Sequence, residues 1–177
     1  LMPLDTPVTL HTYDPQWSVK FAAEQNLLQR AAGALLTHIE HIGSTAIPGM
    51  TAKPTIDILA AIISLTETNQ LIAAVASLGY IYEPRYETDL PNRRYFYKGR
   101  HSEDEFHLHV VEFGTPFWVR HMAFRDYLRN HPDEANEYAQ LKIGLAAKYQ
   151  TDRDSYTDSK GDFIRRIESL AGVSSDN

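Results

Sequence analysis

The sequence predicts an α+β domain in which a mixed sheet comes first and helices come last. Apolar residues recur at helical spacing between residues 14 and 35, which predicts an amphipathic first helix. A nearly continuous apolar run at residues 55–63 suits a strand that is covered on both faces. After residue 115 the apolar residues return to helical spacing, so the last third of the chain is expected to be helical.

Capping residues set the starts of the first two helices. Asp14 precedes Pro15; aspartate is a good helix cap, and proline in the first turn lacks only a hydrogen bond that would be absent there anyway. Ser64 and Glu67 form a capping box for a second helix, which Gly79 ends. Between these helices, strands are expected at residues 38–42 and 55–63.

Aromatic and β-branched residues dominate the middle of the chain and predict further strands. We expect a strand at residues 80–82 and an antiparallel hairpin formed by residues 94–98 and 106–113, turning near residues 98–104. Three helices should follow, at residues 116–129, 132–149 and 157–171. These elements make one domain over residues 8–171, with a sheet-containing core at 8–113, helices at 115–171 and a frayed tail at 172–177.

The composition excludes several classes of protein. The 177 residues are 43% hydrophobic and 23% charged, which is typical of globular chains. The absence of cysteine excludes disulfides, thiolate metal sites and cysteine nucleophiles. A net charge of −6 argues against long nucleic acid or a membrane surface as a partner. Without an apolar run of the ~20 residues that a membrane span needs, or a signal-peptide pattern, we expect a cytoplasmic protein.

The most informative segment, residues 41–58, has the sequence HIGSTAIPGMTAKPTIDI. Gly43 and Ser44 follow a predicted strand and offer close backbone approach and a hydroxyl, which suits a phosphate. Asp57 lies thirteen positions after Ser44 in an apolar strand, where a lone carboxylate must be paired, hydrogen-bonded or bound to a cation. Lys53 either meets a phosphate or pairs with Asp57. On spacing alone, an ordinary turn and a satisfied buried acid explain the segment equally well.

Other charged residues allow both a functional and a structural interpretation. His107 and His109 lie on one face of the last predicted strand and either join Asp57 in a site or face solvent. Tyr156 and Lys160 stand four apart on a predicted helix, where an exposed pair is favoured over a phosphate contact. The predicted hairpin carries a cluster of cations that suits phosphate but also protects a strand edge. The cluster consists of Arg93, Arg94, Lys98 and Arg100.

The segment at residues 41–58 resembles the signature of the GrpB family, whose members carry a His-Ile-Gly-Ser-Thr run followed by Pro-Gly, Ala-Lys-Pro and an aspartate. Further matches in the family order begin at residues 13 (YDP), 79 (GY), 107 (HLH), 124 (FRDYL), 138 (YAQLK) and 156 (YTDSK). The resemblance spans roughly residues 8–171. The family is regarded as similar to the nucleotidyltransferase fold of polymerase-β-like enzymes, which implies a mixed sheet flanked by helices.

In that superfamily a Gly-Ser pair holds a triphosphate, and three carboxylates on two strands bind two Mg²⁺ ions. Gly43, Ser44 and Asp57 match this pattern. Leu59 stands where the second acid is expected, because residues two apart on a strand face the same way. The strand expected to carry the third acid, residues 106–113, offers two histidines instead. One carboxylate and two imidazoles do not make the oxygen-rich ligand set that two Mg²⁺ ions prefer.

The resemblance implies a transferase that moves a nucleoside monophosphate from a nucleotide to an unknown acceptor, with a divalent metal such as Mg²⁺, Mn²⁺ or Zn²⁺. The catalytic and metal-binding candidates are Asp57, His107 and His109; the alternative role for a histidine is that of general base. The phosphate-binding candidates are Gly43, Ser44, Thr45, Lys53, Arg94 and Lys98. The alternative, favoured by the missing acid, is a non-catalytic module that binds a nucleotide or another phosphorylated small molecule. GrpB-like domains fused to dephospho-coenzyme A kinase link that alternative to coenzyme A metabolism.

Overall fold

Five strands form one mixed sheet in the computed structural model, which describes residues 8–100 and 103–173. Along the chain the strands are β1 (Leu36–Ile42), β2 (Ile56–Ile62), β3 (Ile81–Tyr82), β4 (Arg94–Arg100) and β5 (Glu103–Glu112). Their order in the sheet is β1-β2-β5-β4-β3, with β2 and β5 parallel and the other neighbours antiparallel. The predicted α+β class with a mixed sheet is confirmed. Part of the predicted hairpin turn, at residues 101–102, and residues 174–177 of the predicted tail lie outside the described residues.

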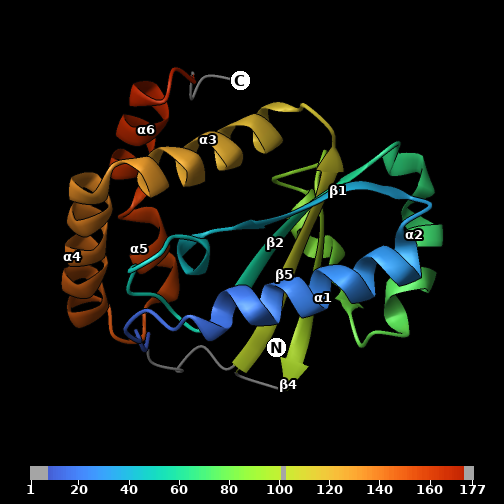
Figure 1. Ribbon diagram of the computed structural model, residues 1–177, viewed down its shortest axis with the longest axis horizontal. Coiled ribbons are helices and arrows are strands. Elements are labelled where there is room, and N and C mark those ends of the chain that lie inside the picture. Colours follow the sequence, from blue (N-terminus) through green and yellow to red (C-terminus); the bar gives the residue numbers. More distant parts are fainter. Residues whose placement is uncertain (1–7, 101–102, 174–177) are drawn as a thin grey trace.

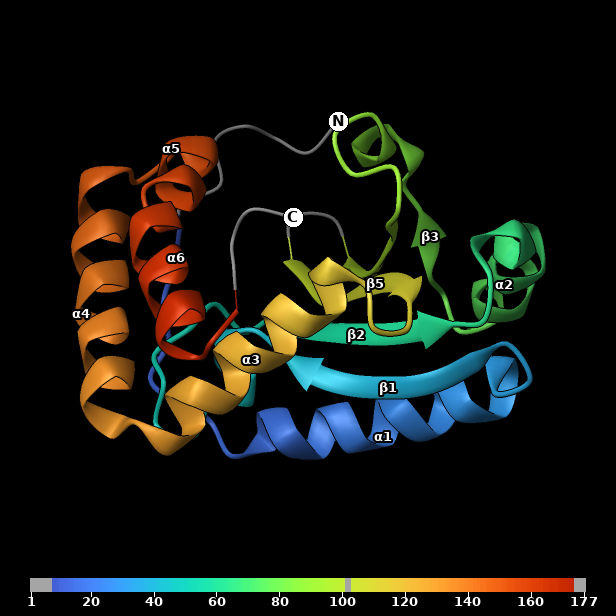
Figure 2. The same ribbon diagram turned by 90° about the horizontal axis from the view of Figure 1, so that it is seen from above.

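Helices pack on both faces of this sheet and at one end of it (Figures 1 and 2). In the described ranges the α-helices are α1 (Gln16–Ala32), α2 (Thr68–Ala76), α3 (Pro116–Asn130), α4 (Pro132–Lys148), α5 (Arg153–Asp158) and α6 (Gly161–Leu170). α1 and α2 share one core with the sheet, α3 crosses the opposite face, and α4, α5 and α6 lie together at one end. Among the described residues, no helix combines the length and the apolar character that a membrane span requires.

The first helix begins where its capping residue predicts. Asp14 Oδ1 accepts a hydrogen bond of 2.9 Å from the backbone N–H of Gln16, at the first residue of α1. Aspartate at this position satisfies one of the backbone donors that a helix start leaves without an intrahelical partner. The apolar stripe of α1 then buries Trp17 and Leu28 against the sheet.

The strand β2 carries different side chains on its two faces. Ile58 packs with Leu28 of α1 in the main core. Asp57 and Leu59 face the other side, where Leu59 is fully buried in a cluster with Trp118 of α3. Cover on both faces explains the nearly continuous apolar run, and it leaves Asp57 at the start of the strand as the single charged exception.

The predicted last helix is wrong in one respect, because α5 and α6 replace a single helix. Asp152 Oδ1 accepts a hydrogen bond of 3.0 Å from the N–H of Ser155 and starts α5 earlier than residue 157. The residues that follow favour turns over helix, and Gly161 is the weakest helix former among them. The break falls at Ser159 and Lys160, and it places Lys160 at the lining of a pocket.

Candidate functional site

The end of β1 and the start of β2 lie beside the middle of β5, at the end of the sheet that faces α4, α5 and α6 (Figure 2). The register pairs Ile42 of β1 with Asp57 of β2, and Asp57 with His107 of β5. The chain leaves β1 through Gly43 into a 3₁₀ turn at Ser44–Ala46. The structure therefore brings the predicted Gly-Ser pair to the predicted carboxylate and histidines, although they are distant in sequence.

Gly43 is required by both its conformation and its surroundings. Its φ is +71°, in the region that side chains disfavour. A Cβ at this position would lie 2.6 Å from Oδ2 of Asp57. The backbone of the turn consequently approaches the carboxylate more closely than any other residue type would permit.

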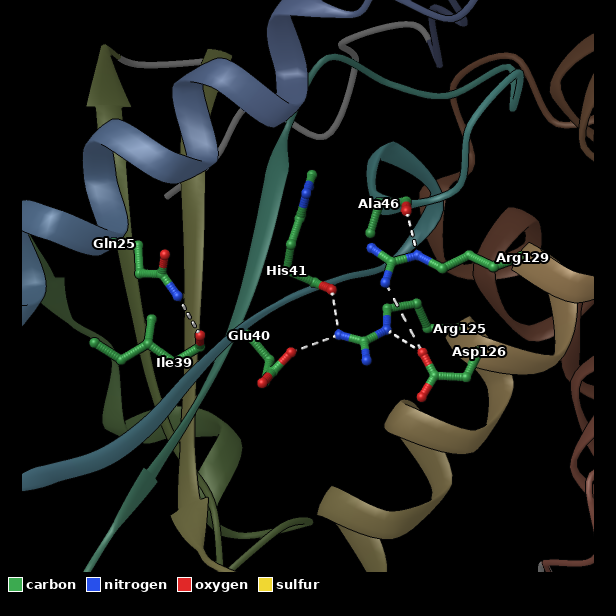
Figure 3. A network of polar contacts seen from close by, with 8 residues as sticks. All are labelled: Gln25, Ile39, Glu40, His41, Ala46, Arg125, Asp126 and Arg129. Carbon is green, nitrogen blue, oxygen red and sulfur yellow. Dashed lines mark hydrogen bonds and ion pairs between the residues drawn. The ribbon is translucent and has the colours of Figure 1, made fainter.

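Helix α3 fixes the turn through two arginines (Figure 3). Arg125 is buried; its Nη1 donates to the Glu40 carboxylate at 2.8 Å and to the backbone carbonyl of His41 at 3.0 Å. One helical turn later, Arg129 Nε donates to the carbonyl of Ala46 at 2.9 Å. These bonds clamp the end of β1 and the 3₁₀ turn to α3, so the turn is held from outside as well as by its own backbone.

Thr45 has a structural role that differs from the predicted one. Its buried hydroxyl donates to the carbonyl of Thr55 at 3.3 Å and accepts from Nε2 of His41 at 3.0 Å. Burial lowers the pKa of His41 to about 4, so this histidine is neutral at neutral pH. Thr45 lines the pocket, but its side-chain donor is committed to the protein.

A pocket of about 130 Å³ opens beside this turn. The side chains that give it its chemical character are Ser44, Lys53, Asp57, His107, Lys142 and Lys160, with Tyr156 beside them. The volume is below the roughly 300 Å³ of a site for a drug-sized ligand, so it suits one end of a larger molecule. Burial raises the pKa of Tyr156 to about 12, which keeps its hydroxyl protonated and able to donate.

Lys142 reaches this pocket from α4 and is only 2% exposed. Its Nζ donates to Oγ of Ser44 at 2.8 Å and to the carbonyl of Thr51. Burial, aided by the charge of Lys160, lowers the pKa of Lys142 to about 7. Burial also lowers the pKa of Lys160 to about 8. The charge of Asp57 opposes this shift, and the charge of Lys53 adds to it. An anion in the pocket would relieve this repulsion and favour protonated lysines.

Asp57 contacts both predicted histidines through one oxygen. His107 Nδ1 lies 3.3 Å and His109 Nε2 lies 3.8 Å from Oδ1 of Asp57. Burial opposes ionisation of Asp57, but hydrogen bonds from the two imidazoles outweigh it and hold the pKa of Asp57 well below its usual range. Burial lowers the pKa of His109 despite its contact with Asp57. The carboxylate is therefore an anion that lies between two imidazoles, with His107 the nearer.

This donor set does not fit the two-Mg²⁺ site of the superfamily. Mg²⁺ prefers oxygen ligands, and Leu59, fully buried, occupies the position of the second acid. Asp57 is the only carboxylate among the described residues that line the pocket. Within the described ranges, no three histidine, aspartate or glutamate side chains are arranged to hold a metal ion. We therefore derive no step through a bound metal.

Two predicted phosphate ligands, Arg94 and Lys98, are corrected by the structure. Both lie on the strand face that packs toward α1 and α2, opposite to Asp57. Nη1 of Arg94 lies 3.3 Å from the Glu87 carboxylate, and Nζ of Lys98 donates to both oxygens of Glu24 at 2.8 and 2.9 Å. These cations are held by carboxylates outside the pocket, because alternate β4 residues point to opposite faces.

Lys142 is the pocket residue that sequence reasoning missed. Two signals were available: Lys142 matches the family order, and it stands four residues after Tyr138 on the stripe of α4 where both side chains are buried. Lysine is rarely buried without a partner or a purpose, but burial of this stripe is visible only once α4 is packed. The structure also places Lys160 in the pocket, where sequence reasoning had favoured an exposed pair.

Comparisons with known proteins agree with this architecture. The family model described as "GrpB protein" matches residues 7–170. YqkA of Bacillus subtilis is 38% identical over 93% of this chain, which spans 47% of YqkA. The glutamate-rich protein GrpB of Alkalihalophilus pseudofirmus is 37% identical over 90% of this chain and 93% of its own length. This chain thus corresponds to about half of one relative and to nearly all of another.

Two enzymes show more distant similarity, one in sequence and the other in fold alone. A dephospho-CoA kinase of Mycolicibacterium paratuberculosis is 26% identical over 90% of this chain, which spans 44% of that protein. The Cid1 poly(U) polymerase, solved with Mg and 3′-dATP, superposes with a TM-score of 0.55 over 85% of this chain and 49% of its own, at 13% identity. This likeness shows a nucleotidyltransferase-like fold.

A crystal structure of the conserved protein GrpB from Enterococcus faecalis matches much more closely. It is 35% identical, with a TM-score of 0.83 over 92% of this chain and 96% of that one. Together with the family model, which covers nearly the whole chain, this shows that the chain belongs to the GrpB family.

Proposed function

We propose that this protein binds the phosphate end of a nucleotide or a related phosphorylated small molecule in the pocket beside Ser44. The observation that carries the proposal is the convergence of Lys53, Lys142 and Lys160 on a pocket where Asp57 is the only carboxylate among the described lining residues. Phosphate oxygens accept strong, charge-assisted hydrogen bonds from such donors. The nucleotidyltransferase-like fold supports the same ligand class, although fold alone does not establish function.

The ligand is expected to enter with its phosphates innermost. Ser44 and the protonated lysines would donate to the phosphate oxygens, and the hydroxyl of Tyr156 would add a neutral donor. The small volume leaves the remainder of the ligand outside the pocket, toward solvent. Dephospho-coenzyme A belongs among the ligands to test, since a dephospho-CoA kinase contains a region similar to this chain.

A thermal-shift screen tests this proposal. The four nucleoside triphosphates, dephospho-coenzyme A and inorganic pyrophosphate are each added to the wild type. A ligand at 100 times its dissociation constant stabilises the fold by about 2.7 kcal/mol, a shift of several degrees or less for this chain length. Lys142→Met should strongly reduce the shift, whereas Lys148→Met, an exposed lysine on the same helix, should retain it in full. No shift with any ligand, or an unchanged shift in Lys142→Met, contradicts the proposal.

A second candidate function is transfer of a nucleoside monophosphate, favoured by the contact between Asp57 and His107 at the pocket. In such a transfer an acceptor hydroxyl would attack the α-phosphorus, a new O–P bond would form, and pyrophosphate would leave. The Asp57–His107 pair would take the hydroxyl proton. Pyrophosphate released from a nucleoside triphosphate by the wild type, and lost in Asp57→Asn, would support transfer. Binding without release would support the non-catalytic module.

A further inference from the structure

Arg93 contacts His109, one of the two histidines that lie near Asp57. Arg93 immediately precedes β4, and its Nη1 lies 3.1 Å from Nδ1 of His109. A guanidinium can only donate hydrogen bonds. Nδ1 of His109 must therefore be the acceptor, which places the proton of the neutral imidazole on Nε2.

Aromatic rings hold the guanidinium in this position. The guanidinium carbon of Arg93 lies 5.3 Å from the ring centre of Tyr95, 5.7 Å from that of Phe117 and 5.8 Å from that of Tyr86. Its Nε is buried and has no hydrogen-bond partner in the described part of the chain. Since the rings restrict movement of the guanidinium, the hydrogen bond to His109 is the fixed feature of this cluster.

The resulting tautomer prevents His109 from coordinating a metal beside Asp57. The Nε2–H of His109 and the Nδ1 of His107 both approach Oδ1 of Asp57, at 3.8 and 3.3 Å. An imidazole coordinates a metal through a nitrogen lone pair, and the other nitrogen then carries the proton. In His109 that proton would sit on Nδ1 and face the N–H of Arg93, donor against donor.

We infer that this site engages phosphate with fixed side-chain cations and without a divalent metal, and that Arg93 is the positioning residue that keeps His109 from coordinating one. Lys53, Lys142 and Lys160 supply the positive charge that metal ions supply in the superfamily. The statement about phosphate rests on the proposed function, whereas the statement about Arg93 and His109 does not. The two parts are tested separately.

The tautomer and the metal are tested on the ligand-free protein. Long-range ¹H–¹⁵N correlation spectra of the imidazoles distinguish the two neutral tautomers, with His109→Gln as the assignment control. Arg93→Gln offers an amide oxygen that can accept from Nδ1–H, so it permits the other tautomer. Arg93→Met, which removes the donor altogether, is a second variant. Arg85→Gln is the control, because exposed Arg85 of the 3₁₀ helix Pro84–Glu87 contacts the Tyr86 ring, as Arg93 does, but makes no hydrogen bond to His109 among those described.

The wild type and Arg85→Gln should show the Nε2–H tautomer of His109 and no change of this signal on titration with Zn²⁺. Arg93→Gln and Arg93→Met should shift His109 toward the Nδ1–H tautomer and bind Zn²⁺ at least about tenfold more tightly than the wild type, in a manner lost on Asp57→Asn. An Nδ1–H tautomer in the wild type, Zn²⁺ binding by its Asp57 and His109, or an unchanged tautomer in both Arg93 variants overturns the inference.

The phosphate part is tested by titrating ATP into the wild type in the presence of EDTA and, separately, of Mg²⁺. The affinity in EDTA should equal or exceed the affinity with Mg²⁺, because the cation neutralises charge that the lysines would otherwise meet. An affinity that rises tenfold or more with Mg²⁺ overturns the metal-free inference. Absence of binding in both conditions instead contradicts the proposed function for ATP, and the imidazole spectra and Zn²⁺ titration still decide the role of Arg93.

Discussion

Lysines on the two faces of the sheet have different partners: a carboxylate on one face and neutral oxygens on the other. On the face toward α1 and α2, Lys98 lies against both oxygens of the Glu24 carboxylate, which is only 3% exposed. At the pocket on the other face, Lys142 contacts the hydroxyl of Ser44 and a backbone carbonyl, and burial lowers its pKa to about 7. A cation matched by a carboxylate stabilises the fold, whereas a cation held against neutral oxygens is suited to an incoming anion.

The largest expected effect is on stability and comes from Lys98→Met. The substitution leaves Glu24 buried without its cation, and removing one partner of such a pair costs about 3 kcal/mol of the free energy of unfolding. Affinity for ATP should stay unchanged, because the pair lies on the face away from the pocket. Urea denaturation and calorimetric titration measure the two quantities. Lys20→Met, which removes an exposed ion pair, is the control and should cost little.

Lys142→Met should show the reverse pattern. Loss of a charged hydrogen bond to phosphate corresponds to about 2 kcal/mol of binding free energy, or roughly 30-fold in the dissociation constant for ATP. The free energy of unfolding should change by no more than about 1 kcal/mol, because removal of a buried cation offsets the loss of its hydrogen bonds. The contrast between the two faces is contradicted if Lys142→Met lowers the free energy of unfolding as much as Lys98→Met does and leaves the affinity for ATP unchanged.

The pH dependence of binding sharpens the same contrast. Burial depresses the pKa of Lys142 from its ordinary 10.5 to about 7 in the free protein, and bound phosphate favours the protonated form. Binding therefore takes up a proton above pH 7, and affinity should fall as pH rises from 7, by up to about tenfold per unit. In Lys142→Met, only titration of the ligand itself contributes to the pH dependence, so the slope due to Lys142 should be absent. Equal slopes of affinity against pH in the two proteins would show that Lys142 does not contact the ligand.

The same depressed pKa predicts the sign of a stability effect. Between pH 7 and the ordinary value near 10.5, the unfolded chain holds the proton on Lys142 and the folded chain does not. The unfolded state binds more protons, so the contribution of Lys142 to the free energy of unfolding increases with pH over this window and is lost as pH falls through about 7. Denaturation of the wild type and of Lys142→Met at several pH values measures this effect: the wild type should gain stability relative to the variant as pH rises from about 7 toward 10.5.

The smallest predicted effect concerns the Ser44 hydroxyl. Ser44→Ala removes one neutral hydrogen-bonding group from the pocket, worth about 1 kcal/mol, or roughly fivefold in ATP affinity. Because Ser44 also accepts from Lys142, the pKa of Lys142 should fall further in this variant. Calorimetric titration at pH 6, where most Lys142 side chains are protonated, separates the loss of the hydroxyl from that second effect.

Local patterns made part of this site predictable from the sequence. The turn glycine, the apolar run around Asp57 and the alternating histidines each follow from rules that span a few residues, and the sheet register then brings them together. Resemblance to the GrpB family supplied the order of the motifs and the fold. The metal and the transferred group stay predictions.

Long-range pairing was not predictable in the same way. Lys98 belonged to a cluster of cations in the sequence, but its partner Glu24 lies 74 positions away on α1. Lys142 reaches Ser44 across 98 positions because α4 packs beside the turn. Apart from Lys53, the cations to which the sequence prediction assigned phosphate binding are clustered along the chain. The pocket contains Lys53, Lys142 and Lys160, which are far apart in the sequence.

The most direct measurement is a crystal structure of this protein with a non-hydrolysable ATP analogue. We predict the terminal phosphates within hydrogen-bond distance of Ser44 and Lys142, with Lys160 beside them and Lys98 still paired with Glu24. Phosphates bound at the β4–β5 hairpin, or anywhere away from the pocket beside Ser44, would contradict the account.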